Sequence, residues 1–259
     1  MDFDVAFVLV AATVVAGVVW GVDALIFSRQ RRMAEGTRDV KEPVIVEYAR
    51  SFFPVLLVVL VLRSFIIEPF RIPSGSMMPT LLVGDFILVN KFSYGIRWPV
   101  LNTKFVDTGA PARGDVAVFR YPRQPDLDYI KRVIGLPGDH IAYYNKTLFI
   151  NGEEVPLAQA GSYRTPSGMP GSAIVYGEAL GDVNHNVLIT PAKYGLEGEW
   201  IVPDGHFFVM GDNRDNSNDG RYWGYVPEDH LVGRAFMIWM NWDWGGEGIL
   251  WTRIGSFIN

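Results

Sequence analysis

Two apolar stretches near the N-terminus are the strongest hydrophobic pattern in the chain. Residues 5–22 form a run of eighteen residues without a charge. As a helix this run would be about 27 Å long at ~1.5 Å per residue, which is enough to span a membrane. A cleaved signal peptide is the alternative, but its first residues are usually basic, whereas this chain begins with Asp2 and Asp4. The pattern predicts a first transmembrane segment over residues 1–27.

The second apolar stretch is shorter. Residues 52–62 are eleven largely apolar residues, and continuing through Arg63 to Ile67 gives sixteen. So short a segment also suits a buried core helix. Arg63 lies close enough to the end for its long side chain to reach the membrane interface. We therefore predict a short second transmembrane segment over residues 51–67.

The polar segment between these stretches, residues 28–50, sets the expected orientation. It carries a group of basic residues, whereas no Lys or Arg precedes the first stretch. The basic residues are Arg29, Arg31, Arg32, Arg38, Lys41 and Arg50. The positive-inside rule then places residues 28–50 in the cytoplasm and the N-terminus outside. With a second span, everything after Glu68 lies on the outer face; without one, it stays in the cytoplasm.

From Asp85 onward the pattern changes to short apolar or alternating runs bounded by Gly, Pro or Asp, which is typical of β-strands. Such runs occupy residues 86–89, 116–119, 129–134 and 206–210. Residues 148–155 predict a β-hairpin, because Asn151-Gly152 is the preferred pair for a type I′ turn. Residues 159–198 are rich in Gly, Pro, Ser and Asn, and they predict an insertion made largely of loops.

Composition removes several classes of function. The net charge of −5 gives no basic surface for nucleic acid, which argues against a nucleic-acid partner. The absence of cysteine excludes disulfides, thiol nucleophiles and zinc–thiolate sites. Residues 215–220 resemble the start of a calcium-binding loop, but Val226 stands where the twelfth position needs a bidentate Glu. We therefore expect neither a metal nor a cofactor.

A search for a catalytic serine finds no familiar histidine partner. The four histidines show no common spacing, and the sequence has no G-x-S-x-G or H-E-x-x-H motif. A Ser-His-Asp triad remains open, since triads are defined by geometry rather than by sequence position.

A lysine is the remaining candidate base. In the strand pattern of residues 129–135, Lys131 shares a face with Tyr129 and Val133. If that face is buried, desolvation disfavours the charged amine, and a neutral amine can take a proton from a serine hydroxyl. The alternative is an ordinary lysine whose ammonium group reaches solvent from the strand.

Residues 70–81 hold the candidate nucleophiles. Ser74 and Ser76 flank a glycine between Pro73 and Pro79, and these prolines favour extended backbone around them. A polar turn between a membrane anchor and a domain is the alternative explanation of this run.

Four motifs in this order and spacing resemble the bacterial type I signal peptidases (leader peptidases). They are residues 73–81 (PSGSMMPTL), 114–119 (GDVAVF), 129–135 (YIKRVIG) and 211–217 (GDNRDNS). The resemblance covers roughly residues 1–139 and 206–240 and implies a membrane-bound serine endopeptidase. It further implies a mainly β fold: an antiparallel β-sheet catalytic domain (68–139 and 204–259) with a smaller inserted β/loop subdomain (140–203).

The resemblance also implies roles for individual residues. Ser76 would be the nucleophile and Lys131 the general base. The Ser74 hydroxyl and the Ser76 backbone N–H would form the oxyanion hole. Ser217 would hydrogen-bond and orient Lys131, while an Asp219–Arg221 ion pair would hold the loop that carries Ser217.

The substrates implied are secretory preproteins cleaved at A-x-A sites. Apolar pockets for the small residues at −3 and −1 are expected around Phe70, Ile72, Met77, Leu81, Ile87, Val118, Tyr129 and Ile130. The lipid bilayer of the bacterial cytoplasmic membrane is the other implied partner, and the protein translocon is a further candidate.

Two other readings stay open. A membrane-anchored β-domain without enzyme activity, such as a chaperone or assembly factor, would need neither Ser76 nor Lys131. Another Ser-Lys protease, such as a self-cleaving repressor, would also use the dyad, but the two apolar spans and the net acidity argue against a DNA-linked protein.

Overall fold

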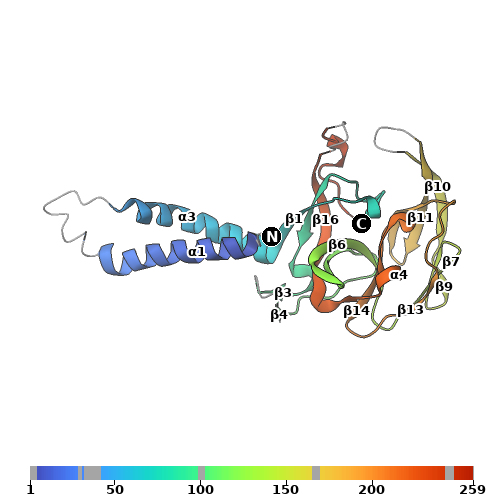
Figure 1. Ribbon diagram of the computed structural model, residues 1–259, viewed down its shortest axis with the longest axis horizontal. Coiled ribbons are helices and arrows are strands. Elements are labelled where there is room, and N and C mark those ends of the chain that lie inside the picture. The colour runs from blue at the N-terminus through green and yellow to red at the C-terminus, as the bar shows by residue number, and fades with distance from the viewer. Residues whose placement is uncertain are drawn as a thin grey trace. The chain divides into compact units, whose positions relative to one another are not determined.

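The computed structural model describes residues 5–28, 31, 42–98, 103–164, 170–242 and 248–258 (Figure 1). These residues divide into two compact units. The first comprises the helical segments up to Ile67 together with Arg97–Phe105, and the second comprises Glu68–Ile96 and the chain from Val106 onward.

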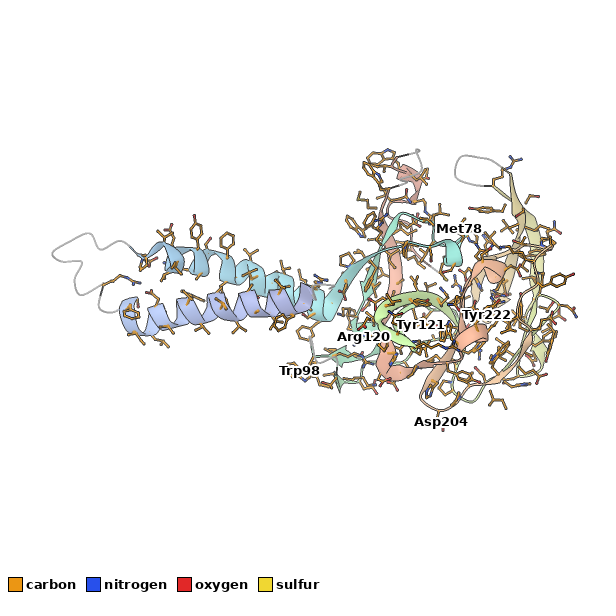
Figure 2. All side chains as sticks on the ribbon, viewed as in Figure 1. Met78, Trp98, Arg120, Tyr121, Asp204 and Tyr222 are labelled. Carbon is orange, nitrogen blue, oxygen red and sulfur yellow. The ribbon has the colours of Figure 1, made fainter. Side chains whose placement is uncertain are left out.

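The first unit is a pair of long apolar helices. Helix α1 (Val5–Val22) continues as a π-helical turn (Asp23–Phe27), and helix α3 (Val44–Val61) continues likewise through Leu62–Ile66. The segments Ala6–Phe27 and Val44–Ile66 are long and apolar enough to cross a membrane, and few of their side chains are buried. Figure 2 shows side chains standing out along both helices.

The two helices pack against each other through small and aromatic residues. The rings of Trp20 and Phe53 lie 5.5 Å apart. A Cβ atom at Gly17 would approach the Phe53 ring to 2.7 Å, so only glycine permits this contact without a shift. Close approach at a small residue is typical of packing between transmembrane helices.

Helix α3 begins earlier than the sequence pattern indicated. It starts at Val44, inside the range 28–50 that was expected to be a loop. The extended Pro43 precedes it, and Glu47 and Arg50 lie within its first two turns. These charges weakened the hydrophobic signal, but backbone hydrogen bonds of a helix do not depend on side-chain polarity.

The second unit is built around a seven-stranded sheet with the strand order β1-β2-β16-β5-β6-β14-β15. The pairs β2–β16, β16–β5, β5–β6, β6–β14 and β14–β15 are all antiparallel, which confirms the mainly β fold class. Its strands are β1 (Ile67–Arg71), β2 (Asp85–Asn90), β5 (Val116–Tyr121), β6 (Gln124–Gly135), β14 (His206–Met210), β15 (Val226–Pro227) and β16 (Leu231–Asn241). Two short strands, β3 (Ile96–Arg97) and β4 (Lys104–Val106), pair separately.

The described residues between 140 and 203 form two smaller sheets, which Figure 1 shows on one side of this unit. One has the order β13-β7-β8-β9 and the other β10-β11-β12. Their strands are β7 (His140–Tyr144), β8 (Thr147–Ile150), β9 (Glu153–Glu154), β10 (Leu157–Arg164), β11 (Pro170–Leu180), β12 (Val183–Ile189) and β13 (Gly198–Ile201). Contacts group them with the large sheet in one unit, so a separate 140–203 subdomain stays a prediction.

The predicted hairpin in this region is confirmed. Ile150 pairs with Glu153 and Phe149 with Glu154 across the turn. Asn151 and Gly152 have φ angles of 54° and 85°, as a type I′ turn requires at both central positions.

The loop-rich interpretation of residues 159–198 is wrong. Strands β10, β11 and β12 span 8, 11 and 7 residues of this region and its edge. The strands contain Gly161, Gly171 and Gly177, which have weak strand propensity, and β10 shows no clean alternation of burial. Pairing with neighbouring strands, which the sequence does not display, stabilises them.

Candidate active site

Ser76 lies in a short 3₁₀ turn, Gly75–Met77, that follows β1. The backbone enters the turn at Ser74 in an extended conformation (φ −132°, ψ 154°). Ser76 is buried, and Figure 2 labels Met78, which directly follows the turn. The turn therefore fixes the direction of the Ser76 hydroxyl on constrained backbone.

Lys131 reaches Ser76 from strand β6. Its Nζ donates a hydrogen bond to Ser76 Oγ at 2.8 Å and another to the carbonyl oxygen of Ile130 at 2.8 Å. Only 4% of Lys131 is exposed, so the condition set for a neutral amine, burial of this strand face, is met. The fold thus joins two buried side chains that stand 55 positions apart in the sequence.

Burial also sets the protonation of this amine. Desolvation lowers the pKa of Lys131 from its ordinary value of 10.5 to about 8, although the negative charges of Asp219 and Asp212 act in the opposite direction. Near pH 8 about half of the molecules therefore carry a neutral amine within hydrogen-bond distance of a serine hydroxyl. This arrangement can activate the hydroxyl as a nucleophile.

Ser74 lies on the same side of the turn as Ser76. Its Oγ is 3.4 Å from Ser76 Oγ, and the residue is exposed. A hydroxyl that is accessible and adjacent to the nucleophile can donate to an oxygen atom of a bound substrate.

The loop between β14 and β15 folds around Asp219. Its carboxylate accepts hydrogen bonds from Arg221 Nε at 2.9 Å and from the backbone N–H of Gly211 at 3.0 Å. The side chains of Asp219 and Arg221 are both fully buried. The expected Asp219–Arg221 ion pair is therefore present, and it closes the loop onto the end of β14.

Ser217 differs from the expectation drawn for it. The residue is buried, but within the part of the chain that the structure describes its Oγ has no hydrogen-bond partner. The carbonyl oxygen of Ile130, rather than Ser217, accepts the second hydrogen bond from Lys131. The reason is local: a strand carbonyl one residue away is already within reach of the amine.

Asn213 is a contact residue to which sequence reasoning assigned no role. Its backbone N–H donates to the carbonyl oxygen of Ser76 at 3.0 Å, and its Nδ2 donates to that of Gly75 at 2.9 Å. Both hydrogen bonds stabilise the turn that carries Ser76. Asn213 lies 138 residues after Gly75 in the sequence. The only signal in the sequence was its place within the GDNRDNS motif.

A second unforeseen group surrounds Arg132, which neighbours Lys131 on β6. Its guanidinium donates to both carboxylate oxygens of Asp212, at 2.9 and 2.8 Å, and to the carbonyl oxygen of Gly114 at 2.7 Å. Burial raises the pKa of Asp212, but Arg132 outweighs it and holds that pKa below its ordinary value. Simple strand alternation would have placed Arg132 in solvent; here both faces of β6 are covered, because Lys131 and Arg132 are both buried.

Most of the residues predicted to form substrate pockets lie in one apolar cluster. Five are almost fully buried, and two are partly buried and pack against them. The buried ones are Ile72, Met77, Leu81, Ile87 and Val118, and the partly buried ones are Phe70 and Ile130. Tyr129 packs against a neighbouring cluster instead. Of the predicted pocket residues in this cluster, Phe70 and Ile130 are the two that keep partly accessible apolar surface.

Comparison with known proteins assigns this arrangement to a family. The model of the family described as signal peptidase, peptidase S26, matches residues 45–242, which include both Ser76 and Lys131. The chain belongs to this signal peptidase family. It is accordingly a serine-type peptidase that acts on the signal peptides of secretory preproteins.

The similarity extends over nearly the whole chain. A signal peptidase I from Pseudomonas fluorescens is 50% identical over 93% of this chain and 94% of its own length. The protein of the same name from Pseudomonas aeruginosa is 49% identical over the same shares of both chains. A solved signal peptidase I from Enterococcus faecalis is 27% identical, covers 48% of this chain and 95% of its own, and has a TM-score of 0.30.

In this signal peptidase, Gly211 is expected to be required for full activity. A Cβ atom there would lie 2.2 Å from Ser217 Oγ and 2.5 Å from the backbone carbonyl oxygen of Ser76. The Gly211→Ala variant must therefore displace the turn that carries Ser76, and a misplacement of ~1 Å costs about 10²-fold in rate. Cleavage of a purified preprotein measures this loss.

Gly177→Ala is the matched control, because a Cβ atom there meets nothing closer than 3.8 Å. It should cleave at the wild-type rate. A Gly211→Ala enzyme that retained more than a third of wild-type activity would contradict the steric argument.

Proposed function

We propose that this chain is a membrane-bound Ser-Lys endopeptidase that cleaves N-terminal signal peptides from exported preproteins after small residues at −3 and −1. The observation that carries the proposal is the 2.8 Å hydrogen bond from Lys131 Nζ to Ser76 Oγ in a buried setting. A solvated lysine would be charged at neutral pH and could not accept a proton, whereas this one has its pKa lowered to about 8 by burial.

The reaction would proceed through an acyl-enzyme. Neutral Lys131 takes the hydroxyl proton of Ser76 as Oγ bonds to the carbonyl carbon of the −1 residue. The resulting ammonium gives that proton to the amine of the +1 residue as the peptide bond breaks. Lys131, neutral again, then takes a proton from water as the water attacks the acyl-enzyme. It returns this proton to Ser76 Oγ as the ester bond breaks, which releases the signal peptide and restores both the Ser76 hydroxyl and the neutral amine.

The oxyanion of each tetrahedral intermediate would be bound by the Ser74 hydroxyl and the Ser76 backbone N–H. The 3.4 Å separation of the two serine Oγ atoms brings the Ser74 hydroxyl close to the attacked carbonyl group. Asp219 and Arg221 would act indirectly by closing the loop that holds Gly211. For Ser217 we propose a role in packing against Gly211, and any contact with Lys131 would require rotation of its side chain.

Specificity for small side chains would come from the apolar cluster beside Ser76. Phe70 and Ile130 present partly exposed surface, while buried residues such as Met77 and Leu81 leave no room for a deep pocket. A shallow apolar surface accepts Ala and excludes large side chains by overlap. The A-x-A pattern of signal-peptide cleavage sites fits this geometry.

Location in the membrane would follow from the two spans. The basic segment at residues 28–50 favours the cytoplasm, so the β-unit would face the periplasm or the extracellular side of the bacterial cytoplasmic membrane. Ser76 follows Ile67 by nine residues, at most about 30 Å of extended chain at ~3.3 Å per residue. The nucleophile would thus stay near the surface where the translocon, a further proposed partner, delivers preproteins.

The proposal is tested by substrate substitution. A preprotein with Ala at −1 should be cut once, after that residue, as sequencing of the product's N-terminus would report. Replacing this Ala by Phe should reduce the cleavage rate by at least ~10²-fold. The buried residues beneath the shallow apolar surface cannot make room for the phenyl ring without strain. The same Ala→Phe change at +2, outside the proposed pockets, is the control, and equal rates for both substrates would refute the specificity.

A further inference from the structure

A buried ion pair joins the inserted strands to the active-site loop. Glu178 on β11 accepts a hydrogen bond from Arg214 Nη1 at 2.7 Å and a second from Arg214 Nη2. Each side chain is only 1% exposed. Burial raises the pKa of Glu178, but Arg214 and His185 outweigh it and lower that pKa to about 2, so the carboxylate is charged at neutral pH.

Arg214 depends on this partner. A guanidinium stays charged at any physiological pH, and a charge in a protein interior is strongly unfavourable unless it is paired and hydrogen-bonded. If Glu178 lost its charge, Arg214 would have to move towards water. A shift of the Arg214 backbone would also disturb the hydrogen bond that Arg221 donates to the carbonyl oxygen of Arg214.

Movement of Arg214 would directly displace the turn that carries Ser76. The preceding residue, Asn213, donates hydrogen bonds to the carbonyl oxygens of both Gly75 and Ser76. Strand β12 supports the same segment from the insertion, because Leu188 donates its backbone N–H to the carbonyl oxygen of Asp212 at 2.8 Å. A continuous path of bonds therefore leads from the inserted sheet to the turn of Ser76.

His185 fills the space between the two carboxylates of this region. Its Nε2 lies 3.2 Å from Glu178 Oε2 and 3.9 Å from Asp212 Oδ1. Cross-strand register places His185 directly opposite Glu178 on the neighbouring strand β12. The inserted sheet thus presents a matched set of polar side chains to the loop, rather than an ordinary apolar packing surface.

We propose that Glu178 is a positioning residue for the reaction, through which the inserted β10-β11-β12 sheet fixes Arg214 and so holds Asn213 and Ser76 in the reactive geometry. This rests on the proposed function of Ser76 and Lys131. It gives the insertion a part in catalysis, even though Glu178 itself touches neither the substrate nor the reacting atoms.

Glu178→Gln in the full-length enzyme tests the role, because glutamine keeps the shape but removes the charge. We expect kcat for preprotein cleavage to fall by about 10- to 10²-fold, with KM changed by less than about threefold, since the loss is in nucleophile geometry and not in substrate binding. The rate at which a covalent serine-directed probe labels Ser76 should fall by a similar factor. Assays are run well below the melting temperature of each variant.

Two further variants separate positioning from mere stability. If Glu178 acts through Arg214, the Glu178→Gln/Arg214→Gln double variant should lose no more kcat than the worse single variant. Asp139→Asn is the matched control: this carboxylate is also buried and binds Arg113 Nη2 at 2.9 Å, but it makes no bond to the 211–221 loop. It should lower the melting temperature and leave kcat within about twofold.

Wild-type kcat and labelling rate in Glu178→Gln would overturn the inference, as would equal kcat losses in Asp139→Asn and Glu178→Gln. A Ser76→Ala enzyme measured alongside separates the two proposals. If Ser76→Ala is inactive while Glu178→Gln is normal, only the inference fails. If Ser76→Ala still cleaves, the dyad itself is wrong.

Discussion

Replacing Lys131 by alanine is expected to reduce preprotein cleavage by about 10⁴-fold or more, because the variant lacks the only base seen to bond to Ser76 among the described residues. The rate would be followed with a purified preprotein and the full-length enzyme in detergent. Turnover near that of wild type would end the dyad proposal.

Loss of folding is separated from loss of chemistry by a second variant, Lys131→Met, which keeps an apolar stem but has no amine. The pKa of Lys131 is lowered from 10.5 to about 8 in the folded protein, so burial of the charged form costs about 3 kcal/mol. That cost is fully present below pH 8 and declines as the pH rises from 8 towards 10.5, because the unfolded state there binds more protons. Lys131→Met should therefore be at least as stable as wild type at pH 7, yet inactive.

The same pKa predicts the pH dependence of the wild-type enzyme. Activity requires the neutral amine, so kcat/KM should rise tenfold per pH unit below pH 8 and level off above it. A profile that was flat between pH 6 and 9 would show that Lys131 does not titrate in this range.

Replacing Ser76 by alanine is the second change with a very large expected effect. The hydroxyl that would form the acyl-enzyme is lost, and cleavage should fall by roughly 10⁴- to 10⁶-fold, as in other serine peptidases that lose the nucleophile. Substrate affinity should change little, because the side chain is small and 8% exposed. Binding of an uncleaved preprotein to the variant measures this directly.

Labelling completes this test. A covalent serine-directed probe should attach to the wild-type chain at Ser76 and not to Ser76→Ala, and peptide mapping would locate the adduct. Ser162→Ala, which removes an exposed hydroxyl on β10, is the control and should label and cleave normally. Labelling at any other serine would contradict the assignment of the nucleophile.

Several features of this protein follow from local sequence. The first apolar run coincides with α1, since a helix in a membrane needs only enough consecutive apolar residues. Asn151-Gly152 determines its hairpin because few residue pairs accept a positive φ at both positions. Alternation along residues 129–133 placed Lys131 on the same face as Val133, and both residues are buried. Each of these patterns is contained within a short segment, so no knowledge of distant contacts is needed.

Other features depend on contacts between distant segments. The meeting of Ser76 with Lys131, and of Gly75 with Asn213, joins positions 55 and 138 residues apart. Burial of Arg132 beside Lys131 requires that both faces of β6 be covered, which alternation alone does not predict. The weakly patterned strands β10 to β12 form because neighbouring strands supply their hydrogen bonds.

The sequence by itself therefore determined that the chain has two long apolar segments, the β character of the body and the motifs that contain the reactive residues, because these are local properties. Only the tertiary structure decided which side chains meet. It left Ser217 without a bond to Lys131, it made Asn213 the residue that holds the nucleophile's turn, and it joined Glu178 to Arg214. Hydrogen bonds and buried ion pairs act over a few ångströms, so their partners are fixed by how the strands pack and not by the order of residues along the chain.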